Sequence, residues 1–469
     1  MPRIYLGKIP LRWCDTCHTP VLSGTCACGA PARPVAVTPP GDARPAFPDD
    51  VDRVNRVFCE HFGAPLIPEG HLALLNKVPA DDRMDEIVLG GAVVGAIRYI
   101  PGEQRWEPLP RPNAAAFLRP TKRYVVVDGG AIPSIRDGGA SVLAPGLLSI
   151  DPAVAEGDEV FILTEAGECI GVGRAKVDAA VATTMERGLV VRTRRNVSSA
   201  CVPGEATWED AVAANERILA EYEAASIQFV RDVAEKNPER PTVSYSGGKD
   251  SLATLLIVLK ALGPVPLLFA DTGLEFPETC GNVEAVAERY GLEVLRVCDE
   301  AAFWSEFERS GPPAVDNRWC CRVCKLHPLG RLIDEHFGEC LSFIGQRKYE
   351  SVRRMQSRRV WRNDRVPQQL SAAPIQQWTA MHVWLYIFRE KAPYNRLYER
   401  GLDRIGCFMC PSSDLATFAL IRESCPELSE MWLAKLAGWQ EKQGLPRDWV
   451  ERGLWRKRGG ADEEEDSYN

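Results

Sequence analysis

The spacing of hydrophobic residues predicts alternating helices and strands in the second half of the chain. Apolar residues recur at helical spacing from Trp208 to Val233, and short β-branched runs then alternate with helical segments. The expected strands are Thr242–Tyr245, Pro266–Ala270 and Glu293–Val297, and the helices between them end near Leu262 and Tyr290. This alternation predicts an α/β domain over residues 205–458, in which helices cover both faces of a parallel sheet.

The first half of the chain has a different pattern. Residues 119–200 hold short apolar runs separated by turn residues, and Glu159–Thr164 and Glu168–Gly173 flank a turn at Ala166-Gly167. These features predict a hairpin within a small β-barrel. Residues 49–118 predict a helix at Val51–Phe62 and two strands around Gly90-Gly91, an α+β segment to which no chemistry can be assigned. The acidic residues 459–469 predict a disordered tail.

Composition narrows the class of protein. Hydrophobic residues make up 45% and charged residues 26%, the balance of globular domains, and the net charge is −8. This charge argues against a wholly basic nucleic-acid coat protein, although a local basic surface stays open. The sequence contains no apolar run long enough to span a membrane, and its start lacks an apolar signal core. We therefore expect a cytoplasmic protein with no membrane partner.

Four of the 16 cysteines fall in the first 35 residues. Cys14 and Cys17 form one pair, Cys26 and Cys28 form another, and a short loop joins them. Four thiolates arranged in this way suit a structural Zn²⁺ site, so residues 1–35 are expected to be a zinc ribbon. A loose cysteine-rich segment without metal is the alternative.

The strongest motif is the string Ser246-Gly247-Gly248-Lys249-Asp250-Ser251 between a predicted strand and a predicted helix. Glycines permit a tight turn in which successive backbone N–H groups converge on phosphate oxygens. The start of the following helix adds partial positive charge, Lys249 adds a full charge, and the serines add hydroxyl donors. Val243 stands where the P-loop of GTPases has its first glycine, and Asp250 follows the lysine, so this is another class of phosphate loop.

The string resembles the PP-loop of ATP pyrophosphatases, which have the adenine nucleotide alpha hydrolase-like fold. Residues 269–279, FADTGLEFPET, resemble a motif of phosphoadenylyl-sulfate (PAPS) reductases at the carboxyl end of the second strand. Gly345-Gln346-Arg347 and the segments 378–386, 394–398 and 406–407 match that family in the same order. The chain is therefore identified as similar to the PAPS reductase family, of an archaeal type with a zinc ribbon and a PUA-like domain.

This resemblance implies a site for ATP, or for PAPS or its relative APS, with Mg²⁺ as a further expected cofactor. The implied nucleotide-binding residues are Ser246, Gly247, Gly248, Lys249, Asp250, Ser251, Asp271, Thr272, Gly273 and Arg347. The expected catalytic residues are Lys249, Asp250 and Cys324.

Five further cysteines cluster in the second half, at Cys320, Cys321, Cys324, Cys407 and Cys410. The pattern resembles the ligand set of iron–sulfur APS and PAPS reductases, which implies a 4Fe–4S cluster held by four of the five. Zinc or plain buried thiols are the alternatives. Which cysteine is the non-ligand is left open, and that residue would be available for sulfur handling.

The sequence also departs from the reductases. They carry a catalytic cysteine in a C-terminal ECG(I/L)H segment, whereas no cysteine follows Cys425 here, and Cys425 lies in a different context, RESCP. This difference puts sulfonate reduction in doubt.

Two features point to RNA. The segment DGGASVLAPGLLSIDPAVAEGDEVFILTEAGECIGVGRA resembles the PUA domain, a small β-barrel of RNA-modifying enzymes, and an arginine cluster at 192, 194 and 195 follows it. Residues 346–365 hold eight Lys or Arg side chains against two acidic residues, which suits a polyanion or else a solvated face. Arg347, Arg358, Arg359 and Arg362 belong to this run.

These observations favour a nucleotide-dependent sulfur-transfer enzyme that modifies RNA, such as tRNA, with a sulfur or electron donor protein as a further partner. A PAPS or APS reductase of sulfur assimilation is the first alternative, and a non-catalytic RNA-binding redox sensor is the second. The sequence does not indicate the modified base, the oligomeric state or the role of residues 49–118.

Overall fold

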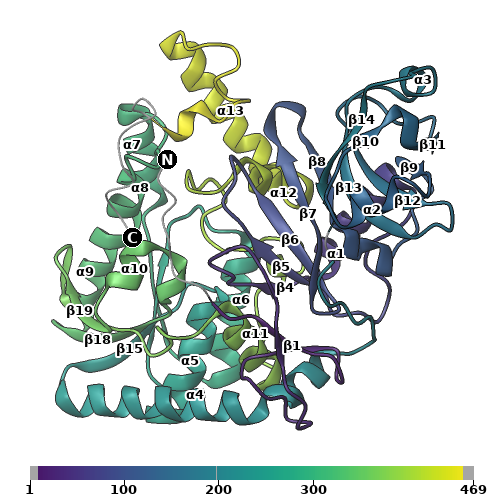
Figure 1. Cartoon of the computed structure of the whole chain (residues 1–469). Coiled ribbons are helices and arrows are strands. Elements are labelled where there is room, and N and C mark those ends of the chain that lie inside the picture. Colours follow the sequence, from purple (N-terminus) through teal and green to yellow (C-terminus); the bar gives the residue numbers. More distant parts are fainter. Residues whose placement is uncertain (1–8, 197, 458–469) are drawn as a thin grey trace. The chain divides into compact units, whose positions relative to one another are not determined.

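The computed structural model describes residues 9–196 and 198–457, so the acidic segment 459–469 lies outside the described residues. The chain forms two compact units: an N-terminal unit from Lys8 to Asn215, and a C-terminal unit that begins at Glu216 (Figure 1). The boundary falls within the long helix α4 (Trp208–Lys236), which extends a few residues beyond the predicted helix. Each unit is described by itself.

Two antiparallel sheets form the first part of the N-terminal unit. A small sheet with the strand order β2-β1-β3 consists of β1 (Arg12–Cys14), β2 (Thr19–Val21) and β3 (Arg33–Pro34). A five-stranded sheet follows in chain order, with β4 (Arg44–Pro45), β5 (Leu74–Lys77), β6 (Met84–Leu89), β7 (Ala92–Ile100) and β8 (Arg105–Pro110). Gly90 and Gly91 make the β6–β7 turn with φ of 52° and 70°, which explains two glycines at this position.

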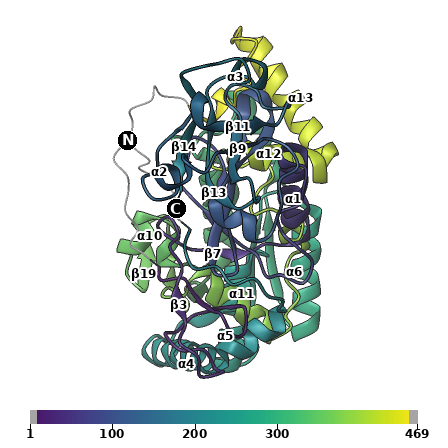
Figure 2. The same ribbon diagram turned by 45° about the vertical axis from the view of Figure 1, so that its right-hand side comes forward.

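A six-stranded sheet forms the rest of the N-terminal unit (Figure 2). Its strands are β9 (Tyr124–Val127), β10 (Val142–Leu143), β11 (Leu147–Ile150), β12 (Glu159–Thr164), β13 (Cys169–Ala175) and β14 (Leu189–Arg195), in the order β10-β14-β13-β12-β9-β11. The short helices α2 (Ile132–Arg136) and α3 (Ala179–Ala182) accompany it. The predicted hairpin is present as β12 and β13, and Gly167 in its turn has φ of 80°.

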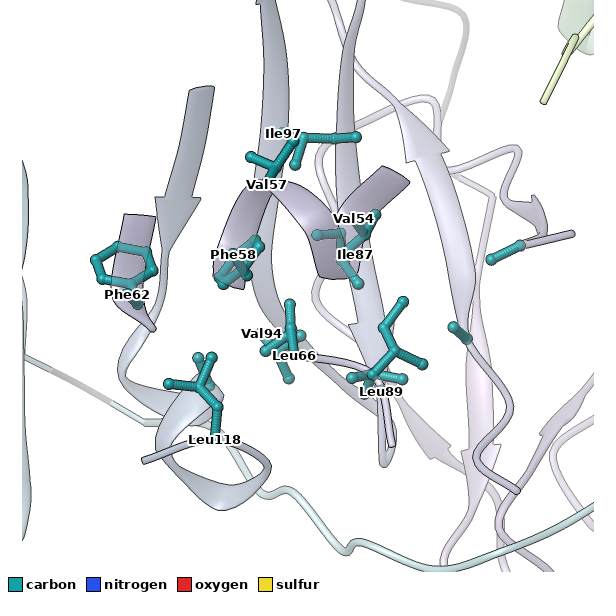
Figure 3. Packing of buried hydrophobic residues seen from close by; sticks show 14 of the residues in the cluster. Val54, Val57, Phe58, Phe62, Leu66, Ile87, Leu89, Val94, Ile97 and Leu118 are labelled. Carbon is teal, nitrogen blue, oxygen red and sulfur yellow. The ribbon is translucent and has the colours of Figure 1, made fainter. Parts of the chain in front are cut away.

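One hydrophobic core joins the two sequence segments that were expected to be separate. Helix α1 (Pro48–Phe62) packs Val54, Phe58 and Phe62 against residues of β6 and β7 (Figure 3). Phe161 of β12 belongs to the same cluster, and its ring lies 4.9 Å from that of Phe62. The α+β segment 49–118 therefore provides part of the packing surface of the β-barrel segment, and the two share one compact unit.

The C-terminal unit contains the predicted parallel sheet. Its strands are β15 (Arg240–Ser244), β16 (Leu267–Asp271), β17 (Val294–Cys298), β18 (Cys340–Ile344), β19 (Val360–Asn363) and β20 (Val366–Ala372). They lie in the order β17-β16-β15-β18-β20-β19, and β19 is antiparallel to its neighbour. The sequence analysis did not predict the last three strands, because the basic and glutamine residues around them hide the apolar pattern.

Helices surround this sheet. They are α5 (Lys249–Leu262), α6 (Pro277–Tyr290), α7 (Glu300–Ser310), α8 (Trp319–Cys321), α9 (His327–His336), α10 (Val352–Gln356), α11 (Ala380–Arg389), α12 (Leu415–Ser424) and α13 (Pro426–Gln443). Residues Leu252–Val258 of α5 are all buried, as the apolar sequence of this helix requires. Leu332 and Ile333 of α9 pack with Leu268 and Leu295 of the sheet.

The strand order places a topological switch point beside β15. The chain passes from β15 to β16 and β17 on one side, and then crosses to β18 and β20 on the other side. In open α/β sheets, ligands bind outside the carboxyl ends of the strands at such a point. The loops that follow β15 and β18, residues 245–248 and 345–347, meet there.

Candidate nucleotide and thiolate site

The phosphate loop adopts a tight turn at the switch point. Gly247 has φ of 72°, and a Cβ at this residue would lie 2.8 Å from Cγ2 of Thr279. Gly248 is the N-cap of α5, so the first backbone N–H groups of that 14-residue helix point into the loop. Glycine is therefore required at residue 247, and the positive end of α5 is presented at the loop.

Hydroxyl groups hold the loop closed. Ser251 Oγ donates to the Gly248 carbonyl oxygen at 2.8 Å and lies 3.3 Å from Ser246 Oγ. The backbone N–H of Lys249 donates to the hydroxyl of Tyr398 at 2.9 Å. Burial raises the pKa of Tyr398, so this hydroxyl keeps its proton and can donate it onward. The sequence motif Tyr394–Tyr398 was noticed for its resemblance, but its role in supporting the loop emerges only from the fold.

Lys249, Asp250 and Arg347 form a charged triad at the loop. Lys249 Nζ lies 2.5 Å from Asp250 Oδ2, and Arg347 Nε donates to Asp250 Oδ1 at 2.7 Å. Lys249 and Arg347 are 8% and 3% exposed. Burial opposes the ionisation of Asp250, but the charges of Arg347 and Lys249 outweigh it and lower the pKa of this carboxyl group. Two cations around one carboxylate leave one positive charge in excess, which suits a phosphate ligand.

The close approach of two loops brings Arg347 to the triad. A Cβ at Gly345 would lie 2.5 Å from the backbone N of Ser251, so only glycine allows the loop after β18 to pass the start of α5. Glu350 then accepts a hydrogen bond from the Arg347 backbone N–H at 2.8 Å. Arg347 and the phosphate loop, which come from two motifs far apart in the sequence, thus meet at the start of α5.

The segment after β16 carries Asp271, Thr272 and Gly273. Asp271 is buried at the end of the strand and accepts hydrogen bonds from the Gly273 backbone N–H at 2.8 Å and from Arg296 Nε at 2.9 Å. Gly273 has φ of 72° and packs against Glu300. Arg296 was missed by the sequence analysis, because no motif marks it.

Thr272 links this segment to the second cysteine group. Thr272 Oγ1 lies 3.5 Å from Cys407 Sγ and donates to Glu275 Oε1 at 3.2 Å. Lys325 Nζ also lies 3.2 Å from Glu275 Oε1. The candidate nucleotide segment and the thiol residues are therefore in direct contact within the C-terminal unit.

The cysteines after residue 318 lie on an irregular helix. Cys320 and Cys321 end α8, residues Arg322–Leu326 form a π-helical turn (η4), and α9 continues to His336. A π-turn inside a helix is a common mark of a functional site, because it shifts the direction of the side chains beyond it. Cys324 lies within this turn.

Cys324 has surroundings of its own. Its side chain is 1% exposed, and burial raises its pKa to about 12, with a further contribution from the charge of Asp299. The Cys320 pKa, by contrast, is raised by a hydrogen bond with Cys321, by burial, and by the charges of Cys321, Cys407 and Cys410. The charge of Cys321 also acts on Cys324, whose burial favours a neutral thiol. The charges of Cys321, Cys407 and Cys410 all act on Cys320, so these four residues are one candidate ligand set.

These four residues fit a 4Fe–4S cluster in the chemistry of their donors. Their sulfur atoms do not lie close enough together to hold a single ion. Among the described residues, such a group occurs once, at Cys14, Cys17, Cys26 and Cys28. A cubane needs wider spacing, because each thiolate binds a different iron. The buried indole N–H of Trp319, beside Cys320, has no hydrogen-bond partner within the described part of the chain, and cluster sulfur is an acceptor for such a donor.

The N-terminal cysteines are already arranged for a metal ion. The sulfur atoms of Cys14, Cys17, Cys26 and Cys28 all lie within 4.8 Å of one another. Cys14 is buried, and its Sγ accepts a hydrogen bond from the Cys17 backbone N–H at 3.4 Å. Arg33 fixes this segment to the β6–β7 turn by donating to the carbonyl oxygens of Gly90 and Gly91 at 2.8 Å and 2.7 Å. Four thiolates at this spacing can bind a metal ion, as the ribbon pattern predicted.

Several cations of the basic run 346–365 have partners within the C-terminal unit. Arg359 donates to the carbonyl oxygens of Ala373 and Pro374 and stacks on Phe229, and burial lowers its pKa. Arg362 pairs with Glu239 and Glu339. These cations stabilise the edge of the sheet around β19 and β20, whereas Arg353 and Arg358 are exposed.

Two parts of the chain match known domain families. Residues 240–413 match the phosphoadenosine phosphosulfate reductase domain, and residues 123–197 match the PUA domain. An uncharacterized protein of Methanocaldococcus jannaschii is 39% identical over 468 residues, 97% of each chain. The chain belongs to the same family as this protein. It thus combines a PAPS reductase domain with a PUA domain.

Other similar proteins match parts of the chain. The adenosine 5'-phosphosulfate reductase of Bacillus subtilis is 29% identical over 182 residues, which cover 38% of this chain and 75% of that protein. The PAPS reductase of Candida auris, solved as a phosphate complex, is 21% identical and covers 46% of this chain and 98% of its own, with a TM-score of 0.33. A PUA domain protein of Thermoplasma acidophilum is 22% identical and covers 34% of this chain and 97% of its own, with a TM-score of 0.28.

None of the described helices is both long enough and apolar enough to cross a bilayer.

Proposed function

We propose that this protein is a nucleotide-dependent sulfur-transfer enzyme that acts on RNA. The observation that carries the proposal is the contact between the nucleotide segment and the thiol group, where Thr272 Oγ1 lies 3.5 Å from Cys407 Sγ. A candidate nucleotide segment that contacts a thiol group suits chemistry that joins nucleotide cleavage to sulfur. The PUA domain supports RNA as the substrate, because neither the nucleotide segment nor the thiol group needs a PUA domain to act on a small nucleotide.

The PAPS reductase domain supplies the nucleotide site. Lys249 and Arg347 would bind the phosphates, the backbone of Gly247 and Gly248 would cradle them, and Asp250 would hold both cations in place. ATP brings four negative charges, of which the triad offsets one, so Mg²⁺ is an expected companion. Asp271, Thr272 and Gly273 are proposed to line the same nucleotide.

The cysteines would hold two metal centres. Cys320, Cys321, Cys407 and Cys410 would hold a 4Fe–4S cluster, which supplies electrons or a sulfur site when bound. Cys14, Cys17, Cys26 and Cys28 would hold a structural Zn²⁺. Cys324 is proposed as the cysteine outside the four, available for sulfur handling.

The proposed reaction uses a sulfur donor at the oxidation level of hydrosulfide. The carbonyl oxygen of a base attacks the α-phosphorus of ATP, and pyrophosphate leaves. The donor sulfur then adds to the activated carbon, and AMP leaves with the original oxygen, so that C=O, ATP and HS⁻ become C=S, AMP and pyrophosphate. Lys249 and Arg347 would stabilise the charge that develops on the phosphates. A donor protein in a cytoplasmic setting would deliver the sulfur.

A reductase of PAPS or APS is the second candidate. The similarity of residues 240–413 to the PAPS reductase domain favours it. However, the sequence after Cys425 lacks the cysteine segment that receives the sulfonate in those enzymes. A non-catalytic RNA-binding redox sensor is the remaining alternative.

Turnover assays separate these functions. Anaerobically purified protein is incubated with ATP, tRNA and sulfide, and separately with PAPS or APS and a dithiol reductant. The proposal predicts RNA-stimulated conversion of ATP to AMP and pyrophosphate and no release of sulfite from PAPS or APS. Release of sulfite from PAPS or APS, with no AMP formed from ATP, would favour the reductase, and no turnover in either assay would favour the sensor.

A further inference from the structure

Glu275 occupies the junction between the nucleotide segment and the thiol group. Its side chain is 4% exposed. Three groups converge on one of its oxygens, Oε1: Thr272 Oγ1 at 3.2 Å, Lys325 Nζ at 3.2 Å and Cys407 Sγ at 3.5 Å. A buried carboxylate that binds three donors at one oxygen is held in a single position. Glu275 lies within the motif of residues 269–279, but it was not among the expected site residues.

The hydroxyl of Thr272 has two acceptors and one proton. It lies within reach of Glu275 Oε1 and, at 3.5 Å, of Cys407 Sγ. A hydroxyl donates one hydrogen bond at a time, so it satisfies either the carboxylate or the sulfur. Lys325 likewise pairs with the carboxylate of Glu275, and its charge also interacts with Cys407 and Cys321. The contacts therefore have two alternative arrangements.

We propose that Glu275 is a positioning residue that couples nucleotide binding to the state of the Cys407 centre. The inference rests on the proposed function, because it takes the 271–273 segment as nucleotide-binding and Cys407 as a ligand. When Cys407 is a metal-bound thiolate, it no longer donates to Glu275, and the two anions compete for Thr272 and Lys325. A nucleotide that moves the 271–273 segment shifts Thr272 toward one of the two acceptors.

Such coupling acts in both directions. If nucleotide binding changes the surroundings of the metal-bound thiolate, then metal occupancy changes nucleotide affinity by the same factor. We expect the Kd for ATP to differ about fivefold or more between the metal-loaded and metal-free protein. Glu275→Gln keeps the size of the side chain but removes its charge, so the ratio of the two Kd values should fall to about one.

The test measures two quantities on the full-length protein. ATP is titrated into metal-loaded and metal-free protein by calorimetry, and the visible absorption of the loaded protein is recorded with and without ATP. Wild type and Glu278→Gln should show both the Kd ratio and an ATP-induced spectral change. Glu278 lies three residues along and pairs with Arg400, so it is a matched control outside the junction. Glu275→Gln should bind ATP in the metal-free form as wild type does, yet lose the spectral change.

Two outcomes overturn the inference, and another addresses the proposed function alone. An unchanged Kd ratio and spectral response in Glu275→Gln would exclude the coupling role. Loss of ATP binding by metal-free Glu275→Gln would show that Glu275 serves the nucleotide site itself. If the purified wild type holds no metal at Cys407, the proposed centre fails, and the coupling is tested by alkylation of Cys407 with iodoacetamide. ATP should then change the labelling rate about fivefold or more in wild type and leave it unchanged in Glu275→Gln.

Discussion

At the scale of single residues, the charged triad explains why the phosphate loop carries both a lysine and an aspartate. Asp250 keeps Lys249 and Arg347 buried and close together, which two free cations would resist. Buried cations that are already desolvated and oriented bind an anion without further ordering. The loop is thus preorganised by its own ion pairs.

Lys249→Ala should weaken ATP binding or turnover severely. The change removes the excess positive charge of the triad, and a lost charge-assisted contact of this kind costs about 2–4 kcal/mol. ATP affinity and AMP formation are measured beside Lys260→Ala, whose lysine lies on the same helix but pairs with Glu223 and Glu390. Equal behaviour of the two variants would exclude Lys249 from the nucleotide site.

His61 should make stability depend on pH. Burial lowers the pKa of His61 to about 4, and the charge of Arg123 adds to the effect. The folded state therefore binds the proton more weakly than the unfolded state, whose histidine has a pKa near 6.5. Stability is complete above about pH 6.5 and is lost as the pH falls toward 4, by about 2 kcal/mol at pH 5.

The His61→Gln variant removes this proton-binding group. Chemical denaturation at pH 7 and pH 5 should show a smaller loss of stability in the variant than in wild type, by about 2 kcal/mol in the transition of the N-terminal unit. An equal loss in both proteins would show that His61 does not titrate in this range.

At the scale of elements, the sequence predicted the central strands well and the cysteine helix poorly. Thr242–Tyr245 and Pro266–Ala270 were expected within two residues of β15 and β16, because buried parallel strands carry uninterrupted apolar runs. The π-turn at 322–326 has no such signal, since it depends on packing against neighbouring elements. This turn was therefore not predictable. The contacts of Glu275 were hidden for a similar reason, because Lys325 and Cys407 lie in distant segments of the chain.

The irregular helix leads to a prediction about metal ligands. Cys320→Ser and Cys407→Ser should lose iron from anaerobically purified protein, whereas Cys324→Ser should keep it, because Cys324 is buried beside Asp299. Iron is measured by elemental analysis with the visible spectrum. Iron loss in Cys324→Ser with retention in Cys320→Ser would reverse the ligand assignment.

The ribbon should be a separate metal centre. Cys14→Ser should lose zinc and keep iron, and Cys407→Ser should show the opposite result. Zinc at both centres and no iron would refute the redox part of the proposal.

At the scale of the whole molecule, the N-terminal unit is expected to provide the RNA surface. The arginines of residues 346–365 are largely used within the C-terminal unit, whereas Arg192 and Arg195 of β14 are exposed on the PUA domain. Removing both should reduce the dependence of tRNA affinity on salt by up to about two units of slope, close to 0.9 for each lost phosphate contact.

The salt dependence is measured by titrating tRNA at several salt concentrations. Arg452→Ala, an exposed arginine that pairs with Asp448, is the control and should retain the wild-type slope. A double Arg192→Ala/Arg195→Ala variant with an unchanged slope would place the RNA surface elsewhere.

The proposed sulfur transfer is tested most directly by a search for labelled sulfur in RNA. Anaerobically purified protein is incubated with tRNA, ATP and ³⁵S-labelled sulfide, and the RNA is digested and its nucleosides are analysed by mass. The proposed function predicts a thiolated nucleoside whose label requires ATP and is absent with Lys249→Ala. Unlabelled RNA with wild-type protein that still converts ATP to AMP would contradict sulfur transfer as the function.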